Sequence, residues 1–269
     1  MRILIQLIIA ALLFSSCRKE EDRYVQKRIS LFKHNIETYS IINDSEILIV
    51  FETGLGDDHS IWTTNDIPIQ ISTMADVLLY DRAGYGKSEA GPYPRNISNL
   101  TFELDSILDS FSNNKKLILV GHSLGGMIIR DYAIKYPAKV TALLFVDPSH
   151  EAYNNPSQLE EDILYNSFYS AYGADAGATM EARELIEDSQ YMRTLSKLPN
   201  IPTIVLTSMK TDANHTTEDR LLWYNAHELL KDGISDFSHI TTTNSGHYIF
   251  LEDPGLFMDN LHSLISKLE

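Results

Sequence analysis

The sequence predicts an α/β protein with a mostly parallel central sheet that helices cover on both faces. Several short runs consist almost wholly of aliphatic and β-branched residues, which is typical of strands that are buried on both faces. Helical patterns separate these runs, and strands that alternate with helices build parallel sheets. A length of 269 residues with 43% hydrophobic residues is enough for one sizeable core.

The strands are predicted from apolar runs and from their order along the chain. A polar turn joins two short strands near the start of the folded part, and the later runs predict buried strands. The predicted strands cover residues 28–32, 37–42, 46–52, 75–81, 116–121, 139–147, 203–208 and 239–243.

The helices are predicted from apolar residues at helical spacing. Residues 98–111 carry such a stripe, so we expect an amphipathic helix there. Other helices are expected from residue 124 to about residue 136 and over residues 220–230. The last helix begins at Asp253-Pro254, a pair that suits a helix start, and its apolar face runs to Leu268.

Residues 150 to about 199 differ from the rest of the chain. They contain no strand run, are rich in Tyr, Glu and Ala, and offer helical fragments at 159–172 and 179–195. About fifty residues are too many for an ordinary loop. We therefore expect a small helical cap inserted into a single domain that covers residues 27–269.

The charge pattern and the residues able to bind metals exclude several function classes. The net charge is −15, from 22 basic and 37 acidic residues, and no basic stripe is visible, so no nucleic acid partner is expected. The single cysteine and the nine histidines lack the spacing of metal ligands. The sequence predicts neither a metal site nor a cofactor.

The N-terminus has the pattern of an export signal. Arg2 precedes an apolar run over residues 3–14, and Ser15-Ser16 then precede Cys17, the only cysteine. This pattern resembles the lipobox of bacterial lipoproteins, although Phe14 departs from it. The resemblance implies a signal peptide at residues 1–16, lipidation of Cys17, and a tether at residues 17–26. The protein would then be an exported, membrane-anchored lipoprotein of a bacterial cell envelope. The alternatives are an uncleaved anchor helix and a signal peptide that is cut near Cys17 by chance.

The segment Gly121-His122-Ser123-Leu124-Gly125 has the spelling G-x-S-x-G between a predicted strand and a predicted helix. A nucleophile on such a sharp turn has strained backbone angles, and its neighbours two residues away must be small. The N–H groups at the helix start lie close to the same point and can stabilise an oxyanion. Ser123 is therefore a candidate nucleophile.

A serine hydroxyl needs a base, and His247 is the best placed histidine. It follows the last predicted strand, which places it at the carboxyl edge of the sheet, the same edge as Ser123. His150 and His215 also follow strand ends and stay open as residues that line the site.

Four motifs in order, "FETGLGDDHSIW", "YDRAGYGKSEAGP", "GHSLGG" and "SGHYIFLEDP", resemble those of α/β-hydrolase-fold serine hydrolases of the esterase and lipase type. The resemblance covers nearly all of the chain after the tether. It implies that Ser123 is the nucleophile and His247 the general base. It also implies that the backbone N–H groups of Leu124 and Leu55 hold the oxyanion, although Thr53 stands where many relatives carry histidine. We expect "YDRAGYGKS" to be scaffold.

The acid of the triad has two main candidates, and Asp219 or another acid stays open beside them. Asp147 ends the sixth strand in the family's order, and Asp212 follows the seventh at about one residue beyond the usual position. We favour Asp147 and keep Asp212 as the alternative.

The predicted activity is cleavage of a carboxylic ester through a Ser-His-Asp triad and an acyl-enzyme intermediate. The expected partner is a small neutral or partly apolar ester. Amide, lactone or thioester hydrolysis are alternatives that use the same machinery. A binding protein that has kept the fold without catalysis is the alternative from another class. The sequence leaves the oligomeric state open.

Overall fold

A computed structural model describes residues 23–31, 33–112 and 114–269. The predicted signal peptide, Cys17 and most of the tether lie outside the described residues. In this part of the chain, no helix is long and apolar enough to cross a membrane.

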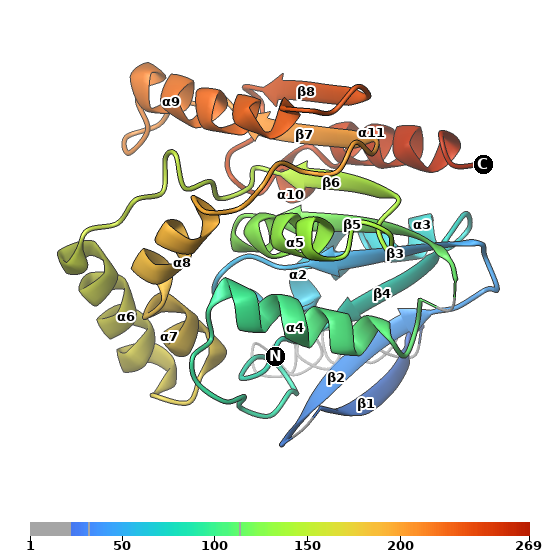
Figure 1. Ribbon diagram of the computed structural model, residues 1–269, viewed down its shortest axis with the longest axis horizontal. Coiled ribbons are helices and arrows are strands. Elements are labelled where there is room, and N and C mark those ends of the chain that lie inside the picture. The colour runs from blue at the N-terminus through green and yellow to red at the C-terminus, as the bar shows by residue number, and fades with distance from the viewer. Residues whose placement is uncertain (1–22, 32, 113) are drawn as a thin grey trace, which may run out of the picture.

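The described residues form an eight-stranded sheet in the order β1-β2-β4-β3-β5-β6-β7-β8 (Figure 1). Strand β2 pairs antiparallel with β1 and with β4, and the other neighbours are parallel. The prediction of a mostly parallel sheet is confirmed. The strands are β1 (Val25–Leu31), β2 (His34–Ile41), β3 (Ile47–Glu52), β4 (Asp76–Tyr80), β5 (Lys116–His122), β6 (Ala142–Val146), β7 (Thr203–Ser208) and β8 (Phe237–Thr242).

Helices cover both faces of the sheet, as predicted. On one face, α4 (Ile97–Leu108) and α5 (Leu124–Lys135) share a buried apolar cluster with the strands. On the other face, α3 (Ile67–Ile71) and α11 (Pro254–Ser266) pack with the strands in a second cluster. Every residue of β3 is buried, which explains why its sequence does not alternate.

Three helices lie between β6 and β7, in the segment where the sequence predicts a cap. They are α6 (Gln158–Tyr172), α7 (Gly177–Ala182) and α8 (Leu185–Met192). Figure 1 shows them to the left of the sheet. The predicted fragment at 179–195 is thus two shorter helices.

The remaining helices flank the last strands or are very short. Helix α9 (Thr217–Glu228) starts with a capping box formed by Thr216 and Asp219, and the side chain of Asp253 caps α11. The sequence did not predict the shortest elements, because one turn of helix shows no periodicity. These are α2 (Ser60–Thr63), η1 (Thr64–Asp66), η2 (Leu229–Lys231) and α10 (Ile249–Glu252).

Candidate active site

Ser123 lies on a strained turn between β5 and α5. Its backbone angles are φ 51° and ψ −121°, a region that residues with a β-carbon rarely adopt. The turn is held by backbone hydrogen bonds, since the Ser123 carbonyl accepts from the N–H of Gly126 and from the N–H of Ser149, both at 2.9 Å. The hydroxyl group therefore stands at the carboxyl edge of the sheet, at the start of a helix.

The two glycines of the pentapeptide are needed for close packing. A β-carbon on Gly121 would lie 2.6 Å from the carbonyl oxygen of Gly125. A β-carbon on Gly125 would lie 2.5 Å from the carbonyl oxygen of Glu52, at the end of β3. The strand, the helix and the loop after β3 approach each other only because both side chains are absent.

His247 follows β8 and faces the same cleft as Ser123. The cleft holds about 270 Å³ and is lined by both residues. The imidazole side chain is 39% exposed, so the cleft is open to solvent at this point. The backbone carbonyl of His247 accepts a hydrogen bond from His122 Nε2 at 3.1 Å, which ties the histidine loop to the end of β5.

Asp147 lies directly after β6, and its carboxylate contacts Nδ1 of the His247 imidazole. Its Oδ2 is 2.7 Å from His247 Nδ1. Its Oδ1 accepts from the backbone N–H of Ser208 at 2.9 Å and from Trp223 Nε1 at 2.7 Å. The carboxylate is fully buried, so these donors replace water.

The charge state of Asp147 follows from these contacts. Burial raises the pKa of the Asp147 carboxyl, but the hydrogen bond and the charge of His247 outweigh it and hold the pKa below its ordinary value. Asp147 is therefore ionised at neutral pH. An ionised acceptor on Nδ1 keeps that nitrogen protonated and leaves Nε2 as the basic atom.

The alternative acid, Asp212, contacts His215 rather than His247. Its Oδ1 accepts from the backbone N–H groups of Asn214 and His215, at 2.8 and 2.9 Å, and lies 2.9 Å from His215 Nδ1. The side chain is about half exposed. Asp212 thus closes a local turn, whereas Asp147 contacts the imidazole.

The two histidines that stayed open have different places. His215 lines the cleft together with Ser123 and His247. His150 is buried, and its Nδ1 accepts from the backbone N–H of Ala152 at 3.1 Å. Burial lowers the pKa of His150 to about 4, which is consistent with a neutral structural residue.

The two predicted oxyanion donors lie on elements that meet at Ser123. Leu124 is the first residue of α5, where a backbone N–H has no partner within the helix. The loop that carries Leu55 passes directly beside the nucleophile, since a β-carbon on Gly54 would lie 3.2 Å from Ser123 Cβ. Leu124 and the loop that carries Leu55 thus both adjoin Ser123, where the two donors are predicted.

A second cavity adjoins the cleft on the side of α5. It holds about 350 Å³ and shares Ser149, Tyr153 and Asn154 with the cleft. Its apolar walls come from α5 and from the helices between β6 and β7. These residues are Leu124, Met127, Leu164 and Leu185.

The aromatic residues of the cap segment contribute little to these walls. Tyr153 lines both the cleft and the cavity. Tyr169 and Tyr172 are exposed, whereas Met180 and Met192 are fully buried against the body. Apart from Tyr153, the aromatic residues of the cap segment do not line the two hollows.

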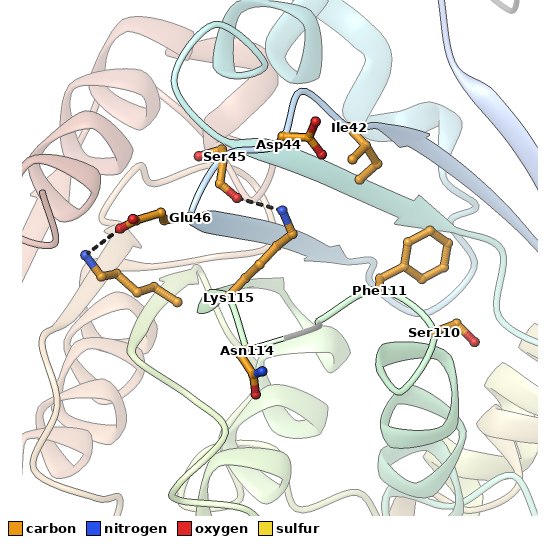
Figure 2. Close-up of a pocket in the computed structure, with 9 residues that line it drawn as sticks. Ile42, Asp44, Ser45, Glu46, Ser110, Phe111, Asn114 and Lys115 are labelled. Atoms are coloured by element: carbon orange, nitrogen blue, oxygen red, sulfur yellow. Dashed lines mark hydrogen bonds and ion pairs between the residues drawn. The ribbon is translucent and has the colours of Figure 1, made fainter.

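A third hollow lies at the opposite edge of the sheet and holds about 720 Å³ (Figure 2). Its lining residues precede β3 and β5 or follow β2, so they belong to the amino ends of the parallel strands. Figure 2 shows Lys115 directed at Ser45, where its Nζ donates to the backbone carbonyl at 2.6 Å. This hollow contains neither a serine on a strained turn nor a histidine.

Among the described residues, Asp58, His59 and Asp81 form a group of side chains that could approach a metal ion. However, His59 Nδ1 and Asp81 Oδ1 lie 2.6 Å apart and share a hydrogen bond. Tyr39 donates to the other carboxylate oxygen of Asp81 at 3.0 Å. The donor atoms are thus engaged with each other, and this group holds the loop before α2 against β4.

Three residues beside the triad were not predicted from the sequence as part of the site. Ser149 Oγ lies 3.5 Å from Ser123 Oγ, and Trp223 holds Asp147. His122 packs on His247, with ring centroids 4.5 Å apart. Burial, together with the charge of His247, lowers the pKa of His122 to about 3, so this histidine is neutral and cannot compete as a base. Only Trp223 carried a signal, because a buried indole N–H needs an acceptor.

Comparison with known proteins agrees with the fold described above. The family described as alpha/beta hydrolase fold matches residues 47–179. The bovine protein named (lyso)-N-acylphosphatidylethanolamine lipase is 28% identical over 135 residues, which cover 48% of this chain and 39% of that protein. The chain thus spans about two fifths of the length of this lipase. An uncharacterized Bacillus subtilis protein, YqjL, is 25% identical over 212 residues, or 78% of this chain and 80% of that protein.

Solved structures give the same fold at lower identity. An esterase from Thermogutta terrifontis superposes with a TM-score of 0.67 at 16% identity, over 91% of this chain and 98% of that one. Mouse alpha/beta hydrolase domain-containing protein 10 superposes with a TM-score of 0.68 at 18% identity, over 91% of this chain and 100% of that one. The chain is therefore an α/β-hydrolase-fold protein, similar to esterases and lipases.

Proposed function

We propose that this protein is a serine hydrolase that cleaves a carboxylic ester through the triad Ser123, His247 and Asp147. The observation that carries the proposal is the 2.7 Å contact between His247 Nδ1 and the buried Asp147, in a cleft that Ser123 also lines. Asp147 is preferred to Asp212, because Asp212 is paired with His215.

The reaction would proceed in two balanced steps. Ser123 Oγ attacks the ester carbonyl while its proton passes to His247 Nε2, and the N–H groups of Leu124 and Leu55 bind the oxyanion. His247 then protonates the leaving alcohol, and the acyl group stays on Ser123. Water attacks this acyl-enzyme and gives a proton to His247, which passes it to Ser123 Oγ as the bond between Oγ and the acyl carbon breaks and the free acid leaves.

A small ester with a neutral, partly apolar acyl group fits the hollows beside Ser123. The apolar cavity begins at Leu124, where the acyl chain of a bound ester would enter. The names of the bovine lipase and of the Thermogutta esterase also favour an ester. Amides, lactones and thioesters pass through the same tetrahedral intermediate, so the substrate panel must include them.

The test is a fluorophosphonate label followed by a substrate panel. We expect an adduct on Ser123 in the folded wild type and none in Ser123→Ala. We also expect the wild type to hydrolyse p-nitrophenyl esters of varied acyl length faster than matched anilides, lactones and thioesters. A folded wild type without an adduct and without turnover would leave a binding protein as the better interpretation.

We further propose that the chain is exported and anchored through a lipidated Cys17. The support is the sequence pattern alone, because residues 1–22 lie outside the described part. Mass spectrometry of the mature N-terminus tests this. A diacylglyceryl group on Cys17 is expected, and an unmodified cysteine or another starting residue would contradict it.

A further inference from the structure

The motif "YDRAGYGKS" places a buried arginine under the loop that passes Ser123. Arg82 is 2% exposed and follows β4. Its Nη1 donates to the carbonyl oxygen of Thr53 at 2.8 Å and to Thr53 Oγ1 at 2.7 Å. Its Nη2 donates to the carbonyl oxygen of Gly54 at 2.9 Å. The guanidinium thus binds two successive carbonyls of this loop.

The bond to Gly54 fixes the direction of the next N–H group. In a planar trans peptide the C=O and N–H bonds point to opposite sides. Because the Gly54 carbonyl points at Arg82, the N–H of Leu55 points away from Arg82. A β-carbon on Gly54 would lie 3.2 Å from Ser123 Cβ, so the nucleophile is the loop's neighbour at this residue.

We infer that Arg82 is a positioning residue for ester hydrolysis, which holds the Gly54–Leu55 peptide with its N–H directed at the oxyanion, and that Glu181 holds Arg82 in place. This inference rests on the proposed function. Arg82 is too well enclosed to touch the substrate, and it acts through the backbone of the loop.

Glu181 binds the guanidinium as a bidentate partner. Arg82 Nε lies 2.9 Å from Oε1 and Nη2 lies 2.9 Å from Oε2. Tyr85 also donates to Glu181 Oε2, at 2.7 Å, and its hydroxyl oxygen accepts from the backbone N–H of Gly56 at 3.2 Å. Glu181 belongs to α7, so one short helix of the cap segment supports the loop at two points.

The geometry requires arginine in particular. A guanidinium presents a planar fork of donors, and this fork binds Glu181 on one side and two carbonyls on the other. A lysine at this position keeps the charge but offers a single nitrogen. Such a residue can satisfy Glu181 or the loop, but not both with the same orientation.

The experiment compares Arg82→Lys and Glu181→Gln with Lys115→Met as a matched control. Lys115 pairs with the buried Asp76 at the opposite edge of the sheet, so its loss destabilises the fold without reaching the cleft. For each variant we measure kcat and KM on an ester, the inhibition constant of a trifluoromethyl ketone, and the melting temperature. The ketone forms a hemiketal with Ser123, and its oxyanion needs the same N–H groups.

We expect Arg82→Lys to lower kcat about 10- to 100-fold, because one oxyanion donor is displaced. KM should change less than about threefold, and the affinity for the ketone should fall by the same factor as kcat/KM. Glu181→Gln places an NH₂ group against one guanidinium nitrogen, so a loss of about 3- to 10-fold is expected. Lys115→Met should keep the kcat and the ketone affinity of the wild type.

Two results would overturn the inference alone. One is an active wild type with Arg82→Lys unchanged in kcat and ketone affinity. The other is that Lys115→Met and Arg82→Lys have the same melting temperature and lose the same factor in kcat and in ketone affinity. A folded wild type without hydrolysis would overturn the proposed function as well. Where Arg82→Lys does not fold, Glu181→Gln decides, and an unchanged ketone affinity in that variant contradicts the inference.

Discussion

The two edges of the sheet differ in which residues adopt unusual backbone angles. At the amino edge, Asp44 and Asn114 have φ values of 59° and 64°. Asp and Asn tolerate the left-handed region, so these are ordinary turns. At the carboxyl edge, Asp147 (φ 44°) is also of a residue type that tolerates this region, whereas Ser123 (φ 51°) is not. Both of these residues line the cleft, and the surrounding backbone hydrogen bonds hold each in place.

The edges also differ in the partners of their buried carboxylates. At the amino edge the buried Asp76 is fully engaged, since it pairs with Lys115 at 2.7 Å and accepts from two backbone N–H groups. At the carboxyl edge the buried Asp147 binds an imidazole that is 39% exposed and therefore open to a ligand. The hollow at the amino edge is the larger, at 720 Å³ against 270 Å³. The strained backbone of Ser123 and the accessible imidazole of His247, rather than the volume of the hollow, distinguish the candidate site.

The strongest test of this contrast compares Ser123 with Ser149, whose Oγ atoms lie 3.5 Å apart. Ser123→Ala should lower kcat on an ester by on the order of 10⁴-fold or more, because the nucleophile is lost. Ser149→Ala removes one neutral hydrogen bond, worth about 1 kcal/mol, and should cost less than about tenfold. Steady-state kinetics on both variants provide the measurement. Equal losses would show that the strained turn does not single out Ser123.

The second test compares the two acids that the sequence left open. Asp147→Asn should lower kcat by about 10³- to 10⁴-fold, because the amide no longer holds the reactive tautomer of His247. Asp212→Asn changes a half-exposed turn and should stay within about threefold of wild type. Kinetics at neutral pH measure both variants. Near-normal turnover in Asp147→Asn with collapse in Asp212→Asn would reverse the assignment.

The sequence could predict the sheet because its buried strands are continuous apolar runs. The run at residues 46–52, for example, contains all of β3 (Ile47–Glu52). The same reasoning placed Ser123, His247 and Asp147 at one edge, because each follows a predicted strand. It could not choose between Asp147 and Asp212, since both follow strands. The choice depends on where the loops after β6 and β7 turn.

The polar contacts that hold the site residues in place could not be predicted from the sequence, for a related reason. Arg82 and Glu181 are 99 residues apart, and Trp223 is 76 residues from Asp147. Periodicity reports which face of an element is buried, but it does not report which polar partner lies across the core. The motif "YDRAGYGKS" is predicted to be scaffold, and the sequence does not indicate that its arginine binds the loop beside the nucleophile.

A third test probes the amino edge itself. Lys115→Met leaves the buried carboxylate of Asp76 without its cation and should lower the free energy of unfolding by about 2–4 kcal/mol. The two backbone N–H groups on Asp76 keep the loss below that of an isolated charge. Urea unfolding measures the change, and kcat should stay at the wild-type value. A fall in kcat at a temperature where the variant is folded would mean that the two edges are coupled.

The smallest expected effect is the pH dependence of stability that distinguishes Glu52 from Asp147, two buried carboxyl groups at the carboxyl edge. Burial raises the pKa of Glu52 from 4.5 to about 6, although Arg82 and Tyr80 partly offset it. The Arg82 guanidinium is shared between Glu52 and Glu181, so it offsets the burial of Glu52 only in part. The raised pKa means that the folded state holds the proton more tightly than the unfolded chain. Ionising Glu52 therefore costs stability as the pH rises from about 4.5 to 6.

This cost is about 2 kcal/mol, because the pKa of Glu52 is about 6 in the folded state against 4.5 in the unfolded chain, and Glu52→Gln should remove it. The difference in unfolding free energy between Glu52→Gln and wild type should thus be about 2 kcal/mol more favourable to the variant at pH 7.5 than at pH 4.5. Asp147 has the opposite sign, because its pKa is lowered and its contribution is lost as the pH falls. Urea unfolding at both pH values gives the measurement. A difference independent of pH would mean that the pKa of Glu52 is the same in the folded and unfolded chain, so that Arg82 offsets its burial fully.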